Sequence, residues 1–294
     1  MIDRLNMFMV LARERHFGRA AESLGITQPS LSSALKTLED QLGVQLVRRG
    51  SRFQGLTPEG ERVLGWARRI VGDARALEAE MAAMRRGITG RLRIGVIPTA
   101  MPRIAALTTP FLSAHPDAGV TILSRSSDEI RDQIAALELD AGVTYLENEP
   151  LGRVQVRPLY RESYCLIDRG SGTGPADWAE AAARPLCLLT PDMQNRRIVS
   201  AHLAAHGPAP APRIESNSML AILSHVATGQ WAAVLPRALA QGLPLPAGVH
   251  ARDLPGAAGQ MVGLVVADRD PQPPIVAALL EAGATIDDGS EAID

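Results

Sequence analysis

The stretch FGRAAESLGITQPSLSSALKTLEDQLGVQLVRRGSR, from Phe17 to Arg52, decides the fold of the N-terminal region. Its first part predicts a short helix from Arg19 to Leu24. That helix ends at Gly25, a residue that tolerates the left-handed backbone of a tight connection. A second helix is predicted to begin at Thr27, because its hydroxyl suits a helix N-cap and Pro29 follows in the first turn. The sequence therefore predicts two short helices joined by a tight turn.

The second of these helices is amphipathic. Its apolar side chains recur at the spacing that forms one buried stripe, namely Leu31, Ala34, Leu35, Leu38 and Leu42. At about 100° per residue, Pro29, Ser32, Ser33 and Lys36 fall on the opposite face. Short polar groups on that face suit entry into the major groove of DNA. A solvated amphipathic helix is the alternative for this segment taken alone.

A basic run follows the second helix. Residues 44–57 read VQLVRRGSRFQGLT, in which Gly50 and Gly55 interrupt a series of three arginines, Arg48, Arg49 and Arg52. This pattern predicts a short basic hairpin, or wing, that contacts DNA phosphates or the minor groove. The alternative is a solvated surface turn, but a turn rarely needs three arginines beside a polar-faced helix.

Together these motifs resemble the winged helix-turn-helix of LysR-type transcriptional regulators. The resemblance rests on the alanine pair, TQPSLS, LEDQLG and the LTPEG that follows the wing, and it covers the whole N-terminal domain, residues 1–58. It implies that the residues facing operator DNA are Gln28, Pro29, Ser30, Ser32, Ser33 and Lys36, with Arg48 and Arg52 on the flanking backbone or minor groove. The chain departs from the family at two positions, because many members have Arg and Gln where it has Ser33 and Ala34.

Composition limits the possible classes of protein. A chain of 294 residues is long enough for two domains. It has no run of about 18 apolar residues and no signal-peptide pattern at its start, so we expect a cytoplasmic protein with no membrane partner. The formal charge of −2 is uneven, because residues 1–90 carry a net +4 and the remainder −6. The basic part is the one with the DNA-binding pattern, as phosphate neutralisation requires.

Residues 59–87 are predicted to form a linker helix that begins at the capping sequence Thr57-Pro58-Glu59. Apolar residues then recur in alternating steps of four and three, as in the seam of a coiled coil: Val63, Ala67, Ile70, Ala74, Leu77, Met81 and Met84. We expect this helix to have no core of its own and to pair with a partner helix. Packing against the chain's own C-terminal domain is the alternative. The resemblance implies a homodimer through this helix, dimers that associate into a homotetramer, and an inverted-repeat operator.

From residue 91 to 294 strands and helices alternate. The strands expected are LRIGVIP, VTILS, DAGVTY, PLCLLT, PRIES, WAAVLP and MVGLVVA. This pattern predicts an α/β domain with mostly parallel sheets and two lobes. We expect the chain to cross between the lobes near Leu159 to Ser163 and in the strand near Val262 to Val266. The fold class predicted is therefore an all-α winged helix-turn-helix domain with a linker helix, followed by a two-lobed α/β domain.

Hydroxyl and amide side chains recur where these strands end, which is where open α/β sheets bind ligands. Each could instead be a helix cap. Their recurrence favours a small polar or anionic effector, and the resemblance implies a periplasmic-binding-protein-like domain with an effector cleft between its lobes. The effector-binding residues expected on this basis are Thr99, Ser126, Thr144, Thr190 and Asn217.

Two other functions stay open. A DNA-targeted α/β enzyme is one, but the sequence has no Walker loop, nucleophile elbow, metal-ligand spacing or persuasive dinucleotide fingerprint, so we expect no catalytic residues, no metal and no cofactor. An architectural DNA binder that senses nothing is the other. The two cysteines, Cys165 and Cys187, lie in apolar strand runs and are expected to act as small hydrophobic residues, not as a disulfide or redox switch.

Overall fold

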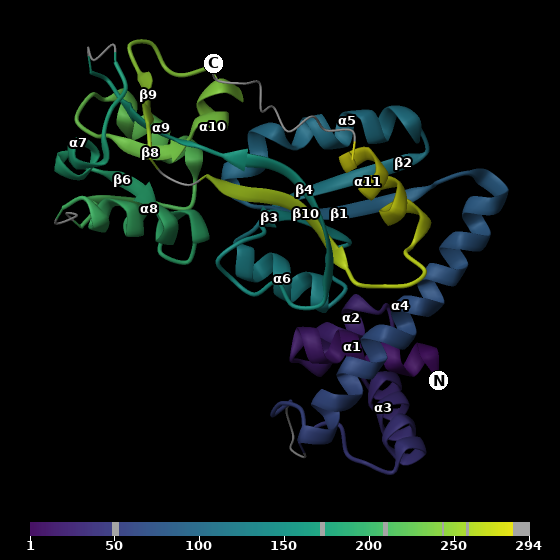
Figure 1. Ribbon diagram of the computed structural model, residues 1–294. Coiled ribbons are helices and arrows are strands. Elements are labelled where there is room, and N and C mark those ends of the chain that lie inside the picture. The colour runs from purple at the N-terminus through teal and green to yellow at the C-terminus, as the bar shows by residue number, and fades with distance from the viewer. Residues whose placement is uncertain (49–52, 171–173, 208–210, 243, 257–258, 285–294) are drawn as a thin grey trace. The chain divides into compact units, whose positions relative to one another are not determined.

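The computed structural model describes residues 1–48, 53–170, 174–207, 211–242, 244–256 and 259–284, and the chain divides into two compact units between Arg85 and Arg86. The N-terminal unit is helical (Figure 1). Its helices are α1 (Ile2–Glu14), α2 (Phe17–Ser23), α3 (Gln28–Leu42) and α4 (Pro58–Arg86).

The turn between α2 and α3 forms as its residues predict. Gly25 has a φ of 65°, and the Ile26 N–H donates to the carbonyl of Ala21 at 3.0 Å. This left-handed glycine closes the end of α2. The Thr27 hydroxyl then accepts a hydrogen bond from the Ser30 N–H at 3.3 Å and caps α3. The helices share one apolar core that includes Leu5, Phe8, Leu11, Ala20, Ala21, Leu31, Leu35 and Leu38.

The wing is anchored to α3. Val47 and Leu56 form an antiparallel bridge, and the Glu39 carboxylate accepts a hydrogen bond from the Leu46 N–H at 2.7 Å. Gly60, in the first turn of α4, lets this helix approach the backbone of Leu46 closely, because a Cβ built at Gly60 would lie 2.1 Å from the Leu46 carbonyl oxygen. The predicted hairpin therefore has a fixed base.

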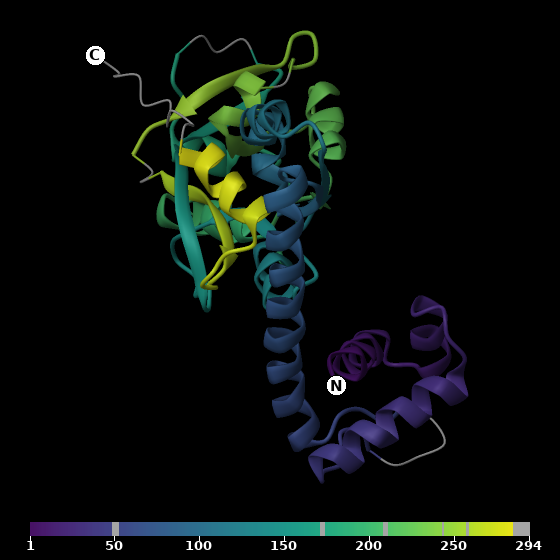
Figure 2. The ribbon, with the colours of Figure 1, turned by 90° about the vertical axis from the view of Figure 1, so that its right-hand side faces the viewer.

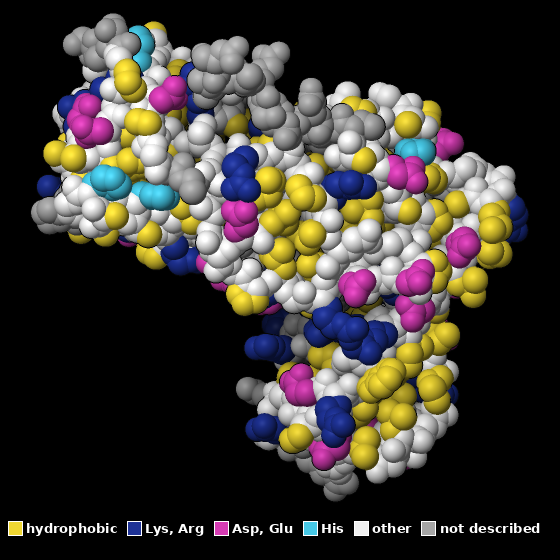
Figure 3. All heavy atoms as spheres, in the orientation of Figure 1, with side chains coloured by type: hydrophobic (Ala, Val, Ile, Leu, Met, Phe, Trp, Pro, Cys, Tyr) yellow, Lys and Arg dark blue, Asp and Glu magenta, His cyan; other side chains and the backbone are white. Residues whose placement is uncertain are grey.

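Helix α4 has two parts with different surroundings. Leu64, Ala67 and Val71 are buried in the core of the N-terminal unit. The expectation that this helix has no core of its own is therefore wrong for its first half, because those residues complete the core that α1 and α3 form. Figure 2 shows that α4 continues as one unbroken helix, and hydrophobic side chains are visible along it in Figure 3. Its exposed large hydrophobic residues are Trp66, Ile70, Leu77, Met81 and Met84.

The first lobe of the C-terminal unit contains a five-stranded sheet in the order β2-β1-β3-β10-β4. Strands β1, β2 and β3 are parallel, whereas β10 is antiparallel to both β3 and β4. Helices α5 and α11 cover one face and α6 covers the other (Figure 1). The strands are β1 (Gly90–Val96), β2 (Ala118–Ser124), β3 (Ala141–Tyr145), β4 (Val154–Glu162) and β10 (Gln260–Ala267). The short helix η1 spans Pro98–Arg103, and the long ones are α5 (Ile104–Ala114), α6 (Ser127–Ala135) and α11 (Pro274–Ala284).

The second lobe has a three-stranded antiparallel sheet, β8-β5-β9, and a parallel pair, β6 and β7. Helices α9 and α10 cover one side and α7 and α8 the other (Figure 1). The strands are β5 (Tyr164–Asp168), β6 (Cys187–Leu189), β7 (Ile214–Ser216), β8 (Ala233–Pro236) and β9 (His250–Leu254). The helices are α7 (Trp178–Ala183), α8 (Gln194–Ala205), α9 (Met219–Ala227) and α10 (Arg237–Gly242).

Two expectations about this unit need correction. The sheets are not mostly parallel, because β5 pairs antiparallel with both of its neighbours and β10 runs against β3 and β4. The first crossing between lobes falls at Ser163, as expected, between β4 and β5. The second comes before Val262–Val266, because β10 pairs throughout with strands of the first lobe. Among the described residues, no helix combines the length and apolar character needed to cross a membrane.

Candidate functional site

Helix α3 presents one exposed polar face. Gln28, Ser32, Ser33 and Lys36 are all exposed, while Leu31, Leu35 and Leu38 on the other side are buried. The polar face is therefore left free by the packing of the helix. Lys36 is the only lysine in the sequence. Figure 3 shows further basic side chains on the surface of the N-terminal unit.

The other residues predicted to face DNA differ in their exposure and in their hydrogen bonds within the protein. Pro29 is exposed in the first turn of α3, and the Ser30 hydroxyl lies 2.8 Å from the Thr27 hydroxyl within the helix cap. Arg48 is exposed at the base of the wing, where its Nε donates to the Leu56 carbonyl at 3.2 Å. Arg49 and Arg52 lie outside the described residues.

A cleft of about 600 Å³ opens between the two lobes of the C-terminal unit. This volume suits a small organic molecule. The first lobe contributes residues from η1 and from the turn between β2 and α6, and the second contributes the turns before α8 and α9 together with α10. The lining residues are Pro98, Met101, Pro102, Ser124, Arg125, Glu129, Asp192, Met193, Asn217, Ser218, Met219 and Leu239.

The five predicted effector residues lie differently around this cleft. Asn217 lines it and is exposed. Thr99 is buried beneath the lining, 3.1 Å from the Tyr145 hydroxyl, and Thr144 is buried and donates to the Ser127 hydroxyl at 3.0 Å. These two strand-end hydroxyls therefore face inward, into hydrogen bonds within the protein.

The remaining two, Ser126 and Thr190, differ in their hydrogen bonding. Ser126 and Glu129 form a capping box at the start of α6, because the Ser126 hydroxyl accepts from the Glu129 N–H at 3.2 Å and the Glu129 carboxylate accepts from the Ser126 N–H at 2.8 Å. The Thr190 hydroxyl is buried and has no hydrogen-bond partner among the described residues. No sequence pattern indicated the methionines of the cleft, since Met fits many apolar surroundings.

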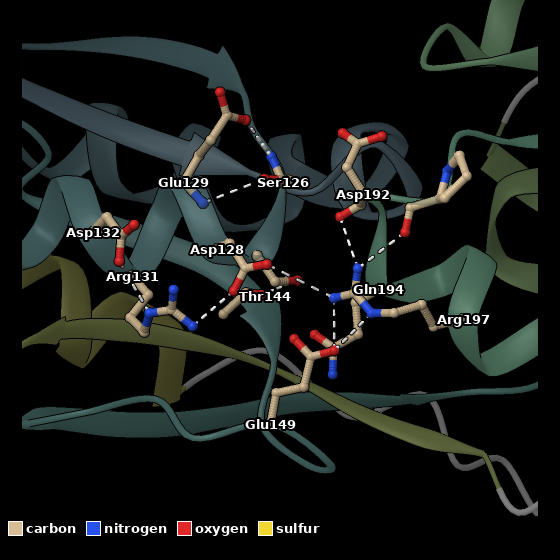
Figure 4. Close-up of polar contacts among 12 residues, drawn as sticks. Ser126, Asp128, Glu129, Arg131, Asp132, Thr144, Glu149, Asp192, Gln194 and Arg197 are labelled. Atoms are coloured by element: carbon tan, nitrogen blue, oxygen red, sulfur yellow. Dashed lines mark hydrogen bonds and ion pairs between the residues drawn. The ribbon is translucent and has the colours of Figure 1, made fainter.

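Arg197 of α8 joins the two lobes beside the cleft. It donates to the Glu149 carboxylate of the first lobe, with its Nη2 2.6 Å from Oε1. Its Nη1 donates to the backbone carbonyl of the cleft residue Asp192 at 2.9 Å. Figure 4 shows Arg197 between these two partners, with Asp128 of α6 4.0 Å away. Gln194 adds a second link, because its Nε2 donates to the Glu147 carbonyl at 2.9 Å.

A buried polar cluster lies at the first crossing between the lobes. The Tyr145 hydroxyl donates to the Glu162 Oε2 at 2.8 Å and accepts from the Asn195 Nδ2 at 3.1 Å, so β3, the end of β4 and the start of α8 are tied together. Glu162 is 1% exposed, and its Oε1 has no partner among the described residues. Burial raises the pKa of the Glu162 carboxyl to about 8, against the lowering effect of the hydrogen bond from Tyr145.

The two cysteines are buried on the side of the second lobe that α9 and α10 cover. The thiol of Cys165 lies 3.4 Å from the Leu235 carbonyl. Burial raises the pKa of the Cys165 thiol to about 12 and that of Cys187 to about 11. Thiols in this state are protonated and weakly nucleophilic.

A helix-turn-helix unit followed by a two-lobed domain with a ligand-sized cleft defines a class of DNA-binding regulator with an attached ligand-binding domain. Comparison with known families agrees. Residues 2–61 match the bacterial regulatory helix-turn-helix protein model of the lysR family, and residues 85–284 match the LysR substrate binding domain model. The chain belongs to the LysR family of transcriptional regulators.

Individual relatives are similar over different lengths. The HTH-type transcriptional regulator XapR of Escherichia coli is 37% identical over 50% of this chain, which spans about half the length of that relative. A probable hydrogen peroxide-inducible genes activator of Mycobacterium xenopi is 34% identical over 55% of this chain and 86% of its own. The structure of a full-length OxyR variant from Pseudomonas aeruginosa has a TM-score of 0.78 and 25% identity, and the match covers 97% of this chain and 95% of that one.

Proposed function

We propose that this protein regulates transcription by placing α3 in the major groove of an operator. The observation that carries the proposal is the exposed polar face of α3, on which Gln28, Ser32, Ser33 and Lys36 are free of contacts with the unit's core. Pro29 and Ser30 complete this face at the helix N-terminus, and Arg48 and Arg52 contact the flanking backbone or the minor groove. The family supports this arrangement.

Two chains pair through the exposed part of α4. Isolated large hydrophobic residues are ordinary on a protein surface, but five on one helix form a stripe that water solvates poorly. Pairing these stripes places two α3 helices on two half-sites, so the operator is an inverted repeat. Association of two such dimers into a homotetramer is part of the proposal.

The cleft of the C-terminal unit binds a small polar effector. Asn217 contacts it directly, while Thr99, Ser126 and Thr144 hold the turns around the cleft in place. The buried Thr190 hydroxyl, which has no partner among the described residues, is the fifth candidate for effector binding. The thiols of this chain are unsuited to the peroxide response named for the Mycobacterium relative, because both are buried and have raised pKa values.

The protein acts on DNA in the cytoplasm and catalyses no reaction. The LysR-family match supports a regulator in place of an enzyme. Consumption of a ligand by the purified protein would contradict this part of the proposal.

Binding to the gene's own upstream DNA tests the proposal. Across a salt series, the full chain should prefer this DNA to random DNA of equal length. Lys36→Gln should weaken binding and reduce the salt dependence by about one counterion, as loss of a phosphate contact does. Arg157→Gln, which removes a charge from an exposed residue of β4, is the matched control and should leave binding unchanged. Equal affinity for the two DNAs at every salt concentration would contradict the proposal.

A further inference from the structure

The cleft holds three charged side chains, Arg125, Glu129 and Asp192, and none of them forms an ion pair with a described residue. Glu129 is engaged locally, because its carboxylate accepts from the Ser126 N–H in the capping box of α6. Arg125, on the first lobe, donates its Nη1 to the Ser124 carbonyl at 2.8 Å and its Nε to Gln133 at 3.2 Å. Neither acceptor is charged, and Arg125 forms no ion pair with a described residue. Its remaining Nη2 is left to contact a ligand.

Asp192, on the second lobe, is the opposite charge. Its backbone carbonyl is fixed by Arg197, but its exposed carboxylate forms no hydrogen bond or ion pair with any described residue. The neighbouring arginines are already occupied, because Arg196 pairs with Glu215 and Arg197 pairs with Glu149. Figure 4 shows the Asp192 side chain extending away from the Glu149 pair.

Apolar side chains from both lobes also line the cleft. Met101 and Pro102 line the cleft from the first lobe, and Met193, Met219 and Leu239 line it from the second. Methionine adapts its flexible thioether to flat and irregular apolar groups. The cleft therefore combines the cationic Arg125 on the first lobe, the anionic Asp192 on the second and apolar side chains on both.

We infer that the effector is a zwitterion with an apolar body, whose anionic group binds Arg125 and whose cationic nitrogen binds Asp192. Such a molecule pairs with both Arg125 and Asp192 and so bridges the two lobes. A simple anion pairs with Arg125 alone and leaves the Asp192 carboxylate without a partner. This inference rests on the proposed function of the cleft and specifies the ligand class that the cleft accepts.

Three probes of one ring size test the inference: para-aminomethylbenzoate, benzoate and benzylamine. Binding to the full chain is measured by calorimetry and by the shift in Tm. The zwitterionic probe should bind more tightly than either singly charged probe. Asp192→Asn should raise its Kd about tenfold, as expected for one charge-assisted hydrogen bond, and leave the Kd of benzoate unchanged. Arg125→Gln should weaken the zwitterion and benzoate but not benzylamine.

Asp117→Asn is the matched control. It removes an exposed carboxylate at the far end of β2, roughly 20 Å along the strand from the cleft, and should change none of these values. Benzoate binding as tightly as the zwitterion, no effect of Asp192→Asn, or no binding of any probe would overturn the inference. Upstream DNA binding measured on the same sample separates this failure from failure of the regulatory function.

Discussion

Glu162 is a carboxyl group whose surroundings make its charged form costly. It is buried at the crossing between the lobes, with one oxygen bonded to Tyr145 and the other without a partner among the described residues. Because its pKa is raised to about 8 in the folded protein, the folded state retains a proton that the unfolded chain releases near its ordinary pKa. Folding stability from this group is therefore full at low pH and falls as the pH rises toward 8.

Glu162→Gln should remove this component of the pH dependence. Between about pH 5 and pH 8 the wild type should lose stability relative to the variant, by up to about 1.4 kcal/mol per pH unit. Tm measured over this range for both proteins tests the expectation. Parallel curves for the two proteins would show that the carboxyl stays ionised in the folded state.

Individual residues also show where sequence reasoning stops. The Thr27 cap and the left-handed Gly25 were predictable because both depend on neighbours within a few positions. The position of Thr99 and Thr144 at strand ends was predictable too, but not the direction of their side chains. Strand spacing does not tell which hydroxyl turns toward the cleft and which toward Tyr145 or Ser127.

At the scale of elements, α4 shows how one helix serves two contacts. The spacing of apolar residues along α4 was predictable from the sequence. Which of them are buried in the chain's own core and which stay exposed was not, because the buried pair Leu64 and Val71 has the same seven-residue spacing as the exposed pair Ile70 and Leu77. The packing of α1 and α3 against α4 decides which of its apolar residues are buried. The exposed row is the part that remains for a partner chain.

Leu77→Asp should disrupt pairing of this row. Loss of two Leu77 side chains from the interface should raise the dimer Kd by roughly 100-fold or more, because each buried leucine contributes about 1.5–3 kcal/mol. Analytical ultracentrifugation measures the change. Glu78→Asp is the control, because it places an aspartate at the neighbouring position, which is also exposed. A Leu77→Asp protein that stays dimeric at the same concentration would place the interface elsewhere.

For the whole molecule, we assign DNA binding to the N-terminal unit and effector binding to the C-terminal unit. The polar face of α3 carries one glutamine, one lysine and otherwise short side chains, so a single copy makes few base contacts. Specificity then depends on the wing, on DNA shape and on duplication of the half-site. In the C-terminal unit, Arg197, Gln194 and Asn195 of α8 bond to the first lobe, so the two lobes are tied together beside the cleft.

The most direct test of the account is a hydroxyl-radical footprint of the full chain on its own upstream DNA. Paired α3 helices predict protected segments that form an inverted repeat, with centres separated by about one helical turn of 10–10.5 bp or a multiple of it. Leu77→Asp should weaken both segments together. A single protected segment without dyad symmetry, or protection that Leu77→Asp leaves intact, would contradict the account.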